Sequence, residues 1–188
     1  MTGASLPVVL IGPMAAGKSH VARHMADHYG LRHVDTDRLI ESRHGPIPKL
    51  FRARGEEEFR RIEAETVAEI LDDPENRECV ISLGGGAPMS PLVQPLLEGR
   101  TVAYLEVDLD TVRPRIRGNT TRPMLQPDPE ARWSQILDER RETFERLATI
   151  HLDGRAPRSV AQIAHDLYTA LGAPEASALA ARGKDRTA

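Results

Sequence analysis

Cysteine and long apolar runs are both scarce in this 188-residue sequence. Cys79 has no partner within the chain, so a disulfide scaffold is excluded. The longest apolar runs, such as residues 6–11, are about six residues long, whereas a membrane-spanning helix needs roughly 20. The chain does not open on a charged segment followed by a long apolar stretch, which argues against a signal peptide. We therefore expect a cytoplasmic protein that does not engage a membrane.

An excess of charge of one sign is also lacking. The sequence holds 25 Lys and Arg against 28 Asp and Glu, a formal net charge of −3, which argues against a polybasic nucleic-acid binder. With 40% hydrophobic and 28% charged residues, it has the composition of an ordinary globular protein. The length favours one compact domain. Lysine is rare and occurs only at Lys18, Lys49 and Lys184, so the lysine beside the glycine at position 17 stands out.

Short apolar runs alternate with amphipathic stretches along the chain. Strands separated in this way by helices indicate a parallel sheet that is covered on both faces. The pattern predicts an α/β fold of three layers with a central parallel five-stranded sheet, whose ligands bind beyond the carboxyl ends of the strands. We expect strands at 6–11, 31–34, 79–83, 101–105 and 150–152, and helices at 18–28, 38–43, 56–71, from Ser90 onward, and at 111–117, 128–148 and 158–170, with an interruption at Gly45-Pro46.

Residues 12–19 read Gly-Pro-Met-Ala-Ala-Gly-Lys-Ser and fit the pattern G-x-x-x-x-G-K-[ST] in full. They follow an apolar strand and open a helix, so successive backbone N–H groups can surround phosphate oxygens at a helix N-terminus. Lys18 can reach the β- and γ-phosphates, and the Ser19 hydroxyl can ligate Mg²⁺. A glycine-rich turn with a solvated lysine is the alternative, and the strand and helix on either side favour the nucleotide site.

Asp35 and Asp37 follow the second expected strand. One carboxylate could hold Mg²⁺ through water, while the other accepts a proton or a hydrogen bond from an alcohol. Capping of the next helix by Thr36 or Asp37 explains these residues about as well.

Further candidate residues come from a helix, a glycine run and a loop. Arg60 lies on the amphipathic helix 56–71, where its planar guanidinium suits a carboxylate, although a solvated arginine is the simpler interpretation. Gly84, Gly85 and Gly86 follow a buried strand and allow a ligand to approach the backbone closely. The proline-rich loop 117–129 carries Arg122, which can close over the transferring phosphate and stabilise its charge, or can be a surface arginine.

In this order along the chain, the motifs resemble those of shikimate kinases. The resemblance covers about residues 6–170 and implies a P-loop kinase fold with a mobile lid loop. It also implies Mg²⁺-dependent transfer of the ATP γ-phosphate to the 3-hydroxyl of shikimate. It rests on residues 12–19, on Asp35-Thr36-Asp37, on Gly55-Glu56 with Phe59-Arg60 and Glu63, on residues 82–86, and on Asn119-Thr120-Thr121-Arg122-Pro123.

The resemblance assigns roles to individual residues. Lys18, Asp37 and Arg122 would be catalytic, with Asp37 holding the 3-hydroxyl as base or orienter, and Ser19 and Asp35 would be the metal site. The carboxylate of shikimate would pair with Arg60 and Arg140, and Gly84, Gly85 and Gly86 would contact the substrate. Arg115 is similar to the family's adenine-stacking arginine. Nucleotide contacts are expected from Gly12, Ala15, Ala16, Gly17, Lys18, Ser19, His20, Arg115, Arg122, Arg155 and Pro157.

The resemblance also sets the domain organisation. We expect one P-loop kinase domain over residues 1–172, with a lid at about 115–129, a substrate-binding region at about 35–63, and a flexible tail at 173–188. The enzyme would be a monomer. His20, His24 and His28, spaced four residues apart, are interpreted as a partly exposed helix face and not as a metal site.

Some features depart from the family pattern, and other functions compete. Pro46-Ile47-Pro48-Lys49 replaces a more helical, acidic stretch, and Arg140 is not followed by the proline that often precedes the family's next aromatic residue. The alternatives are a gluconate kinase-like enzyme and a nucleotide-binding module without transferase activity. The paired arginines with the triple glycine argue against the first, and the Arg122 loop argues against the second.

Overall fold

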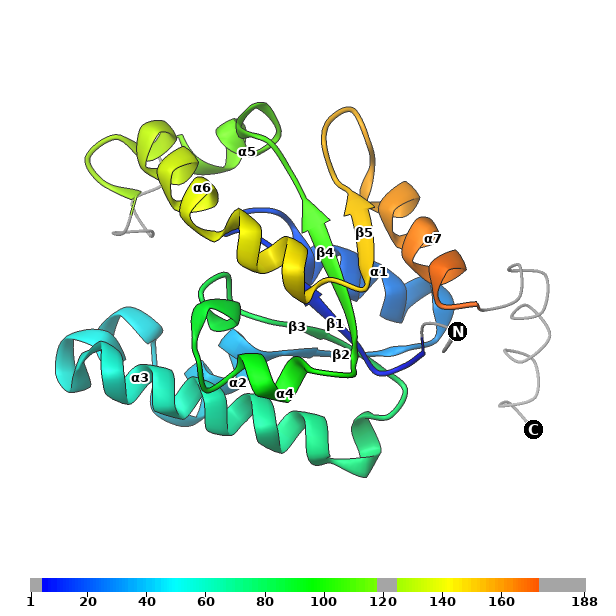
Figure 1. The fold of residues 1–188 in the computed structure, drawn as a ribbon, viewed down its shortest axis with the longest axis horizontal. Helices are drawn as coiled ribbons and strands as arrows, with labels where there is room; N and C mark the ends of the chain where they lie inside the picture. The colour runs from blue at the N-terminus through cyan, green and yellow to red at the C-terminus, as the bar shows by residue number, and fades with distance from the viewer. Residues whose placement is uncertain (1–4, 118–124, 173–188) are drawn as a thin grey trace.

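The computed structural model describes residues 5–117 and 125–172 of the chain. Its centre is a parallel five-stranded sheet in the order β2-β3-β1-β4-β5 (Figure 1). The strands are β1 (Val8–Ile11), β2 (Arg32–Asp35), β3 (Cys79–Ser82), β4 (Thr101–Glu106) and β5 (Ile150–Asp153). The helices are α1 (Lys18–Tyr29), α2 (Thr36–His44), α3 (Ile47–Asp72), α4 (Gln94–Leu97), α5 (Leu109–Ile116), α6 (Pro129–Leu147) and α7 (Val160–Ala170), with short 3-10 turns at Pro74–Asn76 and Ala87–Met89.

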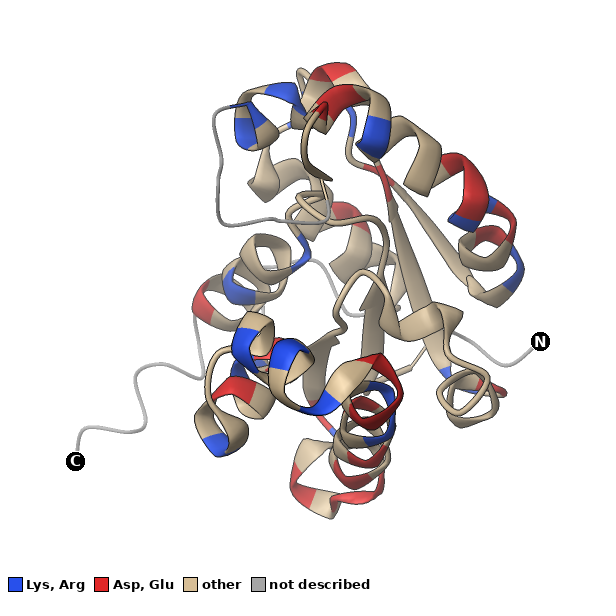
Figure 2. Cartoon of the chain, turned by 90° about the vertical axis from the view of Figure 1, so that its left-hand side faces the viewer, with Lys and Arg blue, Asp and Glu red and all other residues tan. Residues whose placement is uncertain are grey.

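Helices cover both faces of the sheet. In Figure 1, α1 and α7 lie together on one face, and α3, α4 and α6 lie on the other. Every residue of β1 and β3 is buried, as expected for strands in the middle of a covered parallel sheet. Positive and negative residues are interspersed along the helices (Figure 2). Within the described ranges no helix is long and apolar enough to cross a membrane.

Strand register brings the predicted motifs together. Ser82 at the end of β3 pairs with Leu10 of β1 on one side and with Asp35 of β2 on the other. The β1–α1 loop, the start of α2 and the glycine run after β3 therefore emerge side by side at the carboxyl edge of the sheet. This is the position at which ligands of parallel α/β sheets bind.

Most of the expected elements are present, and their ends agree with cap signals in the sequence. The Asp128 side chain accepts a hydrogen bond from the backbone N–H of Ala131 at 3.1 Å and starts α6, as predicted. Ser159 forms a capping box with Gln162 at the start of α7. The histidines at positions 20, 24 and 28 lie on an exposed to half-exposed face of α1, which is the expected interpretation.

The expected interruption at Gly45-Pro46 separates α2 from α3, but the helix expected at 56–71 begins nine residues earlier than predicted. α3 already begins at Ile47 and bends at Gly55, whose φ of 82° lies in the region that glycine tolerates. Pro48 stands in the first turn, where its missing N–H needs no partner. Leu50 is buried, and the rings of Phe51 and Phe59 pack with centroids 4.3 Å apart, so tertiary contacts hold this first segment in place.

The helix expected from Ser90 begins later than predicted. Only Gln94–Leu97 forms an α-helix, although the Ser90 carbonyl does accept hydrogen bonds from the backbone N–H groups of Val93 and Gln94 at 3.0 and 3.1 Å. Pro95 lacks the N–H that would continue a helix begun at Ser90, and it stands instead in the first turn of α4. The core of the predicted lid, residues 118–124 with Arg122, and the predicted tail 173–188 lie outside the described residues.

Candidate active site

The β1–α1 loop is a tight turn whose backbone packs closely against its neighbours. Gly12 has φ 142°, and a Cβ atom there would lie 2.7 Å from the carbonyl oxygen of Leu105, so a side chain does not fit. Ala15 adopts φ 64°, a left-handed conformation that is costly for alanine. The loop leads directly into α1 at Lys18, as a phosphate-binding turn should.

Lys18 is 8% exposed and donates from Nζ to the carbonyl oxygens of Gly12 and Pro13, at 2.8 and 3.0 Å. Burial lowers the pKa of Lys18 to about 8, although the nearby carboxylates of Asp37 and Asp35 act in the opposite direction. The ammonium therefore stands between the loop and the two carboxylates, at the place where a transferring phosphoryl group would need positive charge.

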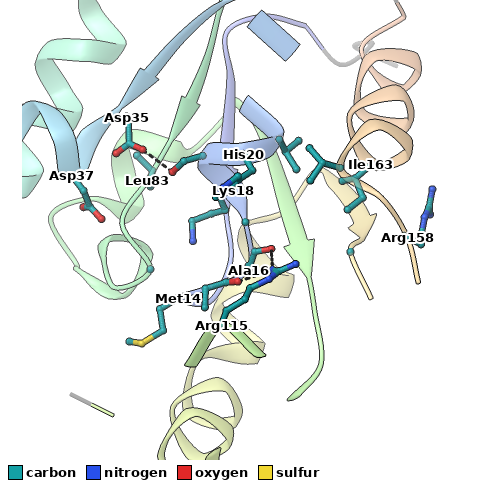
Figure 3. Close-up of a pocket in the computed structure, with 17 residues that line it drawn as sticks. Met14, Ala16, Lys18, His20, Asp35, Asp37, Leu83, Arg115, Arg158 and Ile163 are labelled. Carbon is teal, nitrogen blue, oxygen red and sulfur yellow. Dashed lines mark hydrogen bonds between the residues drawn. The ribbon is translucent and has the colours of Figure 1, made fainter. Parts of the chain in front are cut away.

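Ser19 and Asp35 meet beside the loop. The Ser19 hydroxyl donates to Asp35 Oδ2 at 2.6 Å, while Asp35 Oδ1 accepts from the backbone N–H of Arg38 at 3.2 Å (Figure 3). Asp35 thus performs the capping that the sequence left open between Thr36 and Asp37. One carboxylate oxygen of Asp35 caps α2, and the other accepts the hydrogen bond from the Ser19 hydroxyl at the cavity wall.

Thr36 does not cap α2, which was one of its expected roles, but joins the start of α2 to the glycine run. It is fully buried, and its hydroxyl donates to the carbonyl of Ser82 and accepts from the N–H of Gly84, both at 3.2 Å. These two bonds fix the start of the glycine run relative to Asp37, the next residue along the chain.

Asp37 extends toward the same space as Lys18 (Figure 3). Burial is the main cause that raises the pKa of this carboxyl, the charge of Asp35 adds to it, and Lys18 and Arg60 oppose it. A Cβ atom at Gly84 would lie 2.5 Å from Asp37 Oδ1, which is too close for contact. The carboxylate of Asp37 therefore occupies space that any side chain at position 84 would take. A partly buried carboxylate with a raised pKa is suited to accept a proton from an alcohol.

Arg60 and Arg140 come from different helices and approach the glycine run. Arg60 is held by Glu63, with Nη1 and Oε2 2.7 Å apart, and its guanidinium lies within 2.9 Å of where a Cβ of Gly86 would be. Arg140 donates to the carbonyl of Gly85 at 3.1 Å. Burial and the proximity of Arg60 lower the pKa of Arg140, so the two guanidinium groups repel each other and an anion between them would be stabilised.

Two cavities adjoin along this edge of the sheet. The larger, of about 520 Å³, is lined by the β1–α1 loop with Asp35, Asp37 and Gly85, and also by residues at the start of α7. The smaller, of about 390 Å³, contains both Arg60 and Arg140. Asp37 and Gly85 in the first cavity lie next to the arginines of the second, because both arginines reach the glycine run.

Most predicted site residues lie together, but not all of them. Arg155 forms ion pairs with Asp153 and Glu106, with closest N–O distances of 2.8 and 3.7 Å, and neither it nor Pro157 is among the described residues that line the larger cavity. Arg158, which pairs with Asp166, lines it instead. The predicted residues that do line it are Ala15, Ala16, Gly17, Lys18, Ser19, His20, Asp35, Asp37, Gly85 and Arg115. The residues that line it without having been predicted are Met14, Val21, Leu83, Gly154, Arg158, Val160 and Ile163.

A matched pair of substitutions tests the close approach at the glycine run. Gly84→Ala places a methyl group against Asp37, and we expect kcat to fall about 10- to 100-fold, because a displacement of about 1 Å at a reacting group has effects of this size. Gly86→Ala places its methyl group against Arg60, so we expect it to raise the KM for the substrate of that cavity instead. Steady-state kinetics separate the two, and the same change in both variants would contradict this assignment.

A phosphate-binding loop, a hydroxyl–carboxylate pair and an adjoining carboxylate at the end of a parallel sheet define a P-loop phosphotransferase. Comparison with known proteins identifies the family. A family model for shikimate kinase matches residues 14–171. A shikimate kinase of Mycobacterium avium (strain 104) is 44% identical over 147 residues, which cover 77% of this chain and 82% of that protein. One from Streptomyces coelicolor is 37% identical over 162 residues, covering 85% and 93%.

A solved structure agrees with the sequence relatives. The shikimate kinase from Acinetobacter baumannii, in complex with shikimate, superposes with a TM-score of 0.78 at 29% sequence identity, covering 88% of this chain and 92% of that one. This chain belongs to the shikimate kinase family. The predicted family, fold and class of activity, an ATP-dependent phosphotransferase, are confirmed.

Proposed function

We propose that this enzyme transfers the γ-phosphate of ATP to the 3-hydroxyl of shikimate, with the residues described above in specific roles. The observation that carries the proposal is that Asp37 lies at the glycine run and feels the charges of both Lys18 and Arg60, while Arg140 bonds the carbonyl of the same run. Shikimate has one carboxylate and three hydroxyls. A site for it needs positive charge at one end and a carboxylate at the reacting alcohol, and the two adjoining cavities supply these.

The larger cavity takes the nucleotide. Backbone N–H groups of the loop surround the phosphates, and the ammonium of Lys18 stabilises charge as it develops on the transferring group. Lys18 can leave its carbonyl partners Gly12 and Pro13 for the phosphates, since a phosphate oxygen is a stronger acceptor than a carbonyl. Arg115, predicted to stack on adenine, lines the same cavity.

The acceptor alcohol lies between Asp37 and the glycine run. Asp37 accepts a hydrogen bond from the 3-hydroxyl and takes its proton as the oxygen attacks the γ-phosphorus. The bond between the γ-phosphorus and the β,γ-bridging oxygen breaks, and ADP leaves with that electron pair. The shikimate carboxylate pairs with Arg60 and Arg140, which fixes the ring so that only one hydroxyl reaches Asp37. Glu63, 1% exposed and bonded to Arg60, keeps that guanidinium in place before the substrate arrives.

Ser19 and Asp35 suit a magnesium ion. Both offer hard oxygen atoms, 2.6 Å apart, at the wall of the larger cavity. The described residues include no group of three or more His, Cys, Asp or Glu able to hold a metal, which fits an ion that depends on phosphate and water oxygens for its remaining ligands. The chemistry supplied by bound Mg²⁺ is neutralisation of charge on the β- and γ-phosphates.

Several expectations stay predictions. These are the lid at about 115–129 with Arg122 over the phosphates, the nucleotide contacts of Arg155 and Pro157, the substrate-binding region at about 35–63, and the division of the chain at residue 172. The monomeric state and the cytoplasmic location stay predictions too.

A coupled ADP-release assay tests the proposed function. Shikimate, quinate and gluconate are offered in parallel as acceptors, each with and without Mg²⁺. We expect turnover with shikimate that depends on Mg²⁺. Turnover on gluconate but not on shikimate would favour the gluconate kinase alternative, and no stimulation by any acceptor would favour a binding module.

Arg60→Ala is expected to raise the KM for shikimate by about 10- to 100-fold, the usual effect of losing a charge-assisted hydrogen bond, while the KM for ATP changes little. Arg61→Ala is the matched control, because Arg61 pairs with Glu58 and Glu65 on the exposed side of α3. Equal losses for both substrates in Arg60→Ala would mean that Arg60 is only structural.

The pKa of Lys18 sets a pH dependence. In the free enzyme, kcat/KM for ATP should fall as pH rises through about 8, because Lys18 loses the proton that attracts phosphate. The fall in kcat should begin at higher pH, since bound phosphates stabilise the charged lysine. The pH profiles of both parameters check this, and an alkaline fall in kcat/KM at the same pH as that in kcat would contradict it.

A further inference from the structure

Side chains hold every carbonyl group of the loop from Gly12 to Ala16. Lys18 bonds the first two carbonyls. Arg115 Nη1 donates to the carbonyl oxygens of Ala15 and Ala16, at 2.8 and 3.0 Å. The carbonyl between these pairs belongs to Met14, and it accepts a hydrogen bond at 3.0 Å from Nε1 of Trp133. Trp133 is 2% exposed and lies on α6, more than a hundred positions along the chain.

The bond from Trp133 determines the direction of the next amide. In a trans peptide the C=O and the following N–H point to opposite sides, and the Met14–Ala15 peptide is not among the cis bonds of the structure. With the Met14 carbonyl directed at the indole, the N–H of Ala15 is directed away from it. Ala15 lines the larger cavity, so its amide is available to phosphate.

The strained conformation of Ala15 explains why the peptide before it needs the hydrogen bond from Trp133. Its φ of 64° costs alanine about 1 kcal/mol, and such residues persist only where their surroundings hold them. Rotation of the Met14–Ala15 peptide by half a turn would bring φ of Ala15 back to the negative range and remove the strain. The same rotation would turn the Ala15 N–H out of the cradle, and the hydrogen bond from Trp133 opposes it.

We propose that Trp133 is a positioning residue for the nucleotide: by holding the Met14 carbonyl, it keeps the Ala15 amide directed at the ATP phosphates. The inference rests on the proposed function only in taking the β1–α1 loop as the phosphate site. α6 also carries Arg140, whose bond to the Gly85 carbonyl ties the same helix to the acceptor side.

Trp133→Phe tests the proposal, because phenylalanine keeps a large ring and removes the N–H. We expect calorimetric titration with ADP to give about fivefold weaker binding, the effect of one lost neutral hydrogen bond, and the KM for ATP to rise by a similar factor. The KM for shikimate should change less than twofold, within the scatter of surface effects. Trp133→Met, which also lacks a hydrogen-bond donor, repeats the test if the phenylalanine variant does not fold.

A matched control and a rescue separate positioning from packing. Phe144 lies on the same helix and packs against Tyr104. We expect Phe144→Leu to lower the melting temperature of the protein without weakening ADP binding. Ala15→Gly removes the strain that drives the rotation, so the variant carrying both Trp133→Phe and Ala15→Gly should recover part of the ADP affinity.

Wild-type ADP affinity in Trp133→Phe would overturn the proposal. Two other results would also overturn it. One is a loss of ADP affinity in Trp133→Phe that adding Ala15→Gly does not reduce. The other is an equal loss of ADP affinity in Phe144→Leu when that variant and Trp133→Phe have the same melting temperature. The ADP titration needs no acceptor. Failure of the enzyme to phosphorylate shikimate would therefore refute the proposed function, while the ADP titration would still test the role of Trp133 independently.

Discussion

Lys18→Ala is expected to reduce turnover with shikimate by at least about a hundredfold, the effect of removing one group that stabilises transition-state charge. The ammonium is buried beside the phosphate loop, and no other lysine lies nearby in the sequence to replace it. The fold should survive, because the variant also removes a charge that burial disfavours, as the lowered pKa of Lys18 shows. Stopped-time product assays together with a thermal melt measure both effects.

Lys49→Ala is the control for this experiment. Lys49 is exposed in the first turn of α3, and its removal should leave both turnover and melting temperature within the range of surface substitutions. Turnover in Lys18→Ala close to that of the Lys49 control would contradict the phosphate assignment of the loop.

Asp37→Asn is expected to lower kcat by about 10²- to 10⁴-fold if the carboxylate takes the proton of the alcohol. The amide keeps the shape of the side chain and can still accept a hydrogen bond, but it cannot serve as a base. A loss of only about tenfold would instead assign Asp37 the role of orienting the hydroxyl, the loss expected from one weakened hydrogen bond. Rapid-quench measurement of the phosphoryl-transfer step separates these outcomes from slow product release.

Stability gives Asp37→Asn an independent check. Burial and Asp35 raise the pKa of Asp37 in the folded protein, so near neutral pH the ionised carboxylate opposes folding. The asparagine variant should therefore melt at the same temperature as the wild type or higher. Asp27→Asn, on the exposed face of α1, is the control, and an equal loss of kcat in both variants would contradict a catalytic role for Asp37.

The site motifs could be predicted from sequence because each directly follows a strand. Parallel strands place their carboxyl ends at one edge, so the β1–α1 loop, Asp35 and the glycine run had to meet once the strands were recognised. The side-chain chemistry of Asp37 and Arg60 left structural alternatives open, and the resemblance to shikimate kinases assigned their roles. The structure brings both residues to the glycine run.

Other features depend on contacts that leave no local pattern. Pro46 and Pro48 indicate a break, yet α3 begins there because its first segment packs through Leu50 and Phe51 onto the rest of the helix. Trp133 fits a buried position on an amphipathic helix, and nothing near it in the sequence shows that its indole N–H reaches Met14.

The loop between β5 and α7 shows the same limit. Arg155 and Pro157 were predicted to contact the nucleotide, and Arg158 was not among the candidates. The structure places Arg158 at the cavity and Arg155 in ion pairs with Asp153 and Glu106, and no pattern in the sequence distinguishes the two arginines.

A crystal structure with ADP and shikimate bound is the decisive experiment for the proposed site. We expect the ADP phosphates inside the β1–α1 loop, the 3-hydroxyl of shikimate within hydrogen-bond distance of Asp37, and its carboxylate between Arg60 and Arg140. Shikimate bound with its carboxylate away from both arginines, or with a different hydroxyl facing Asp37 and the nucleotide, would contradict it.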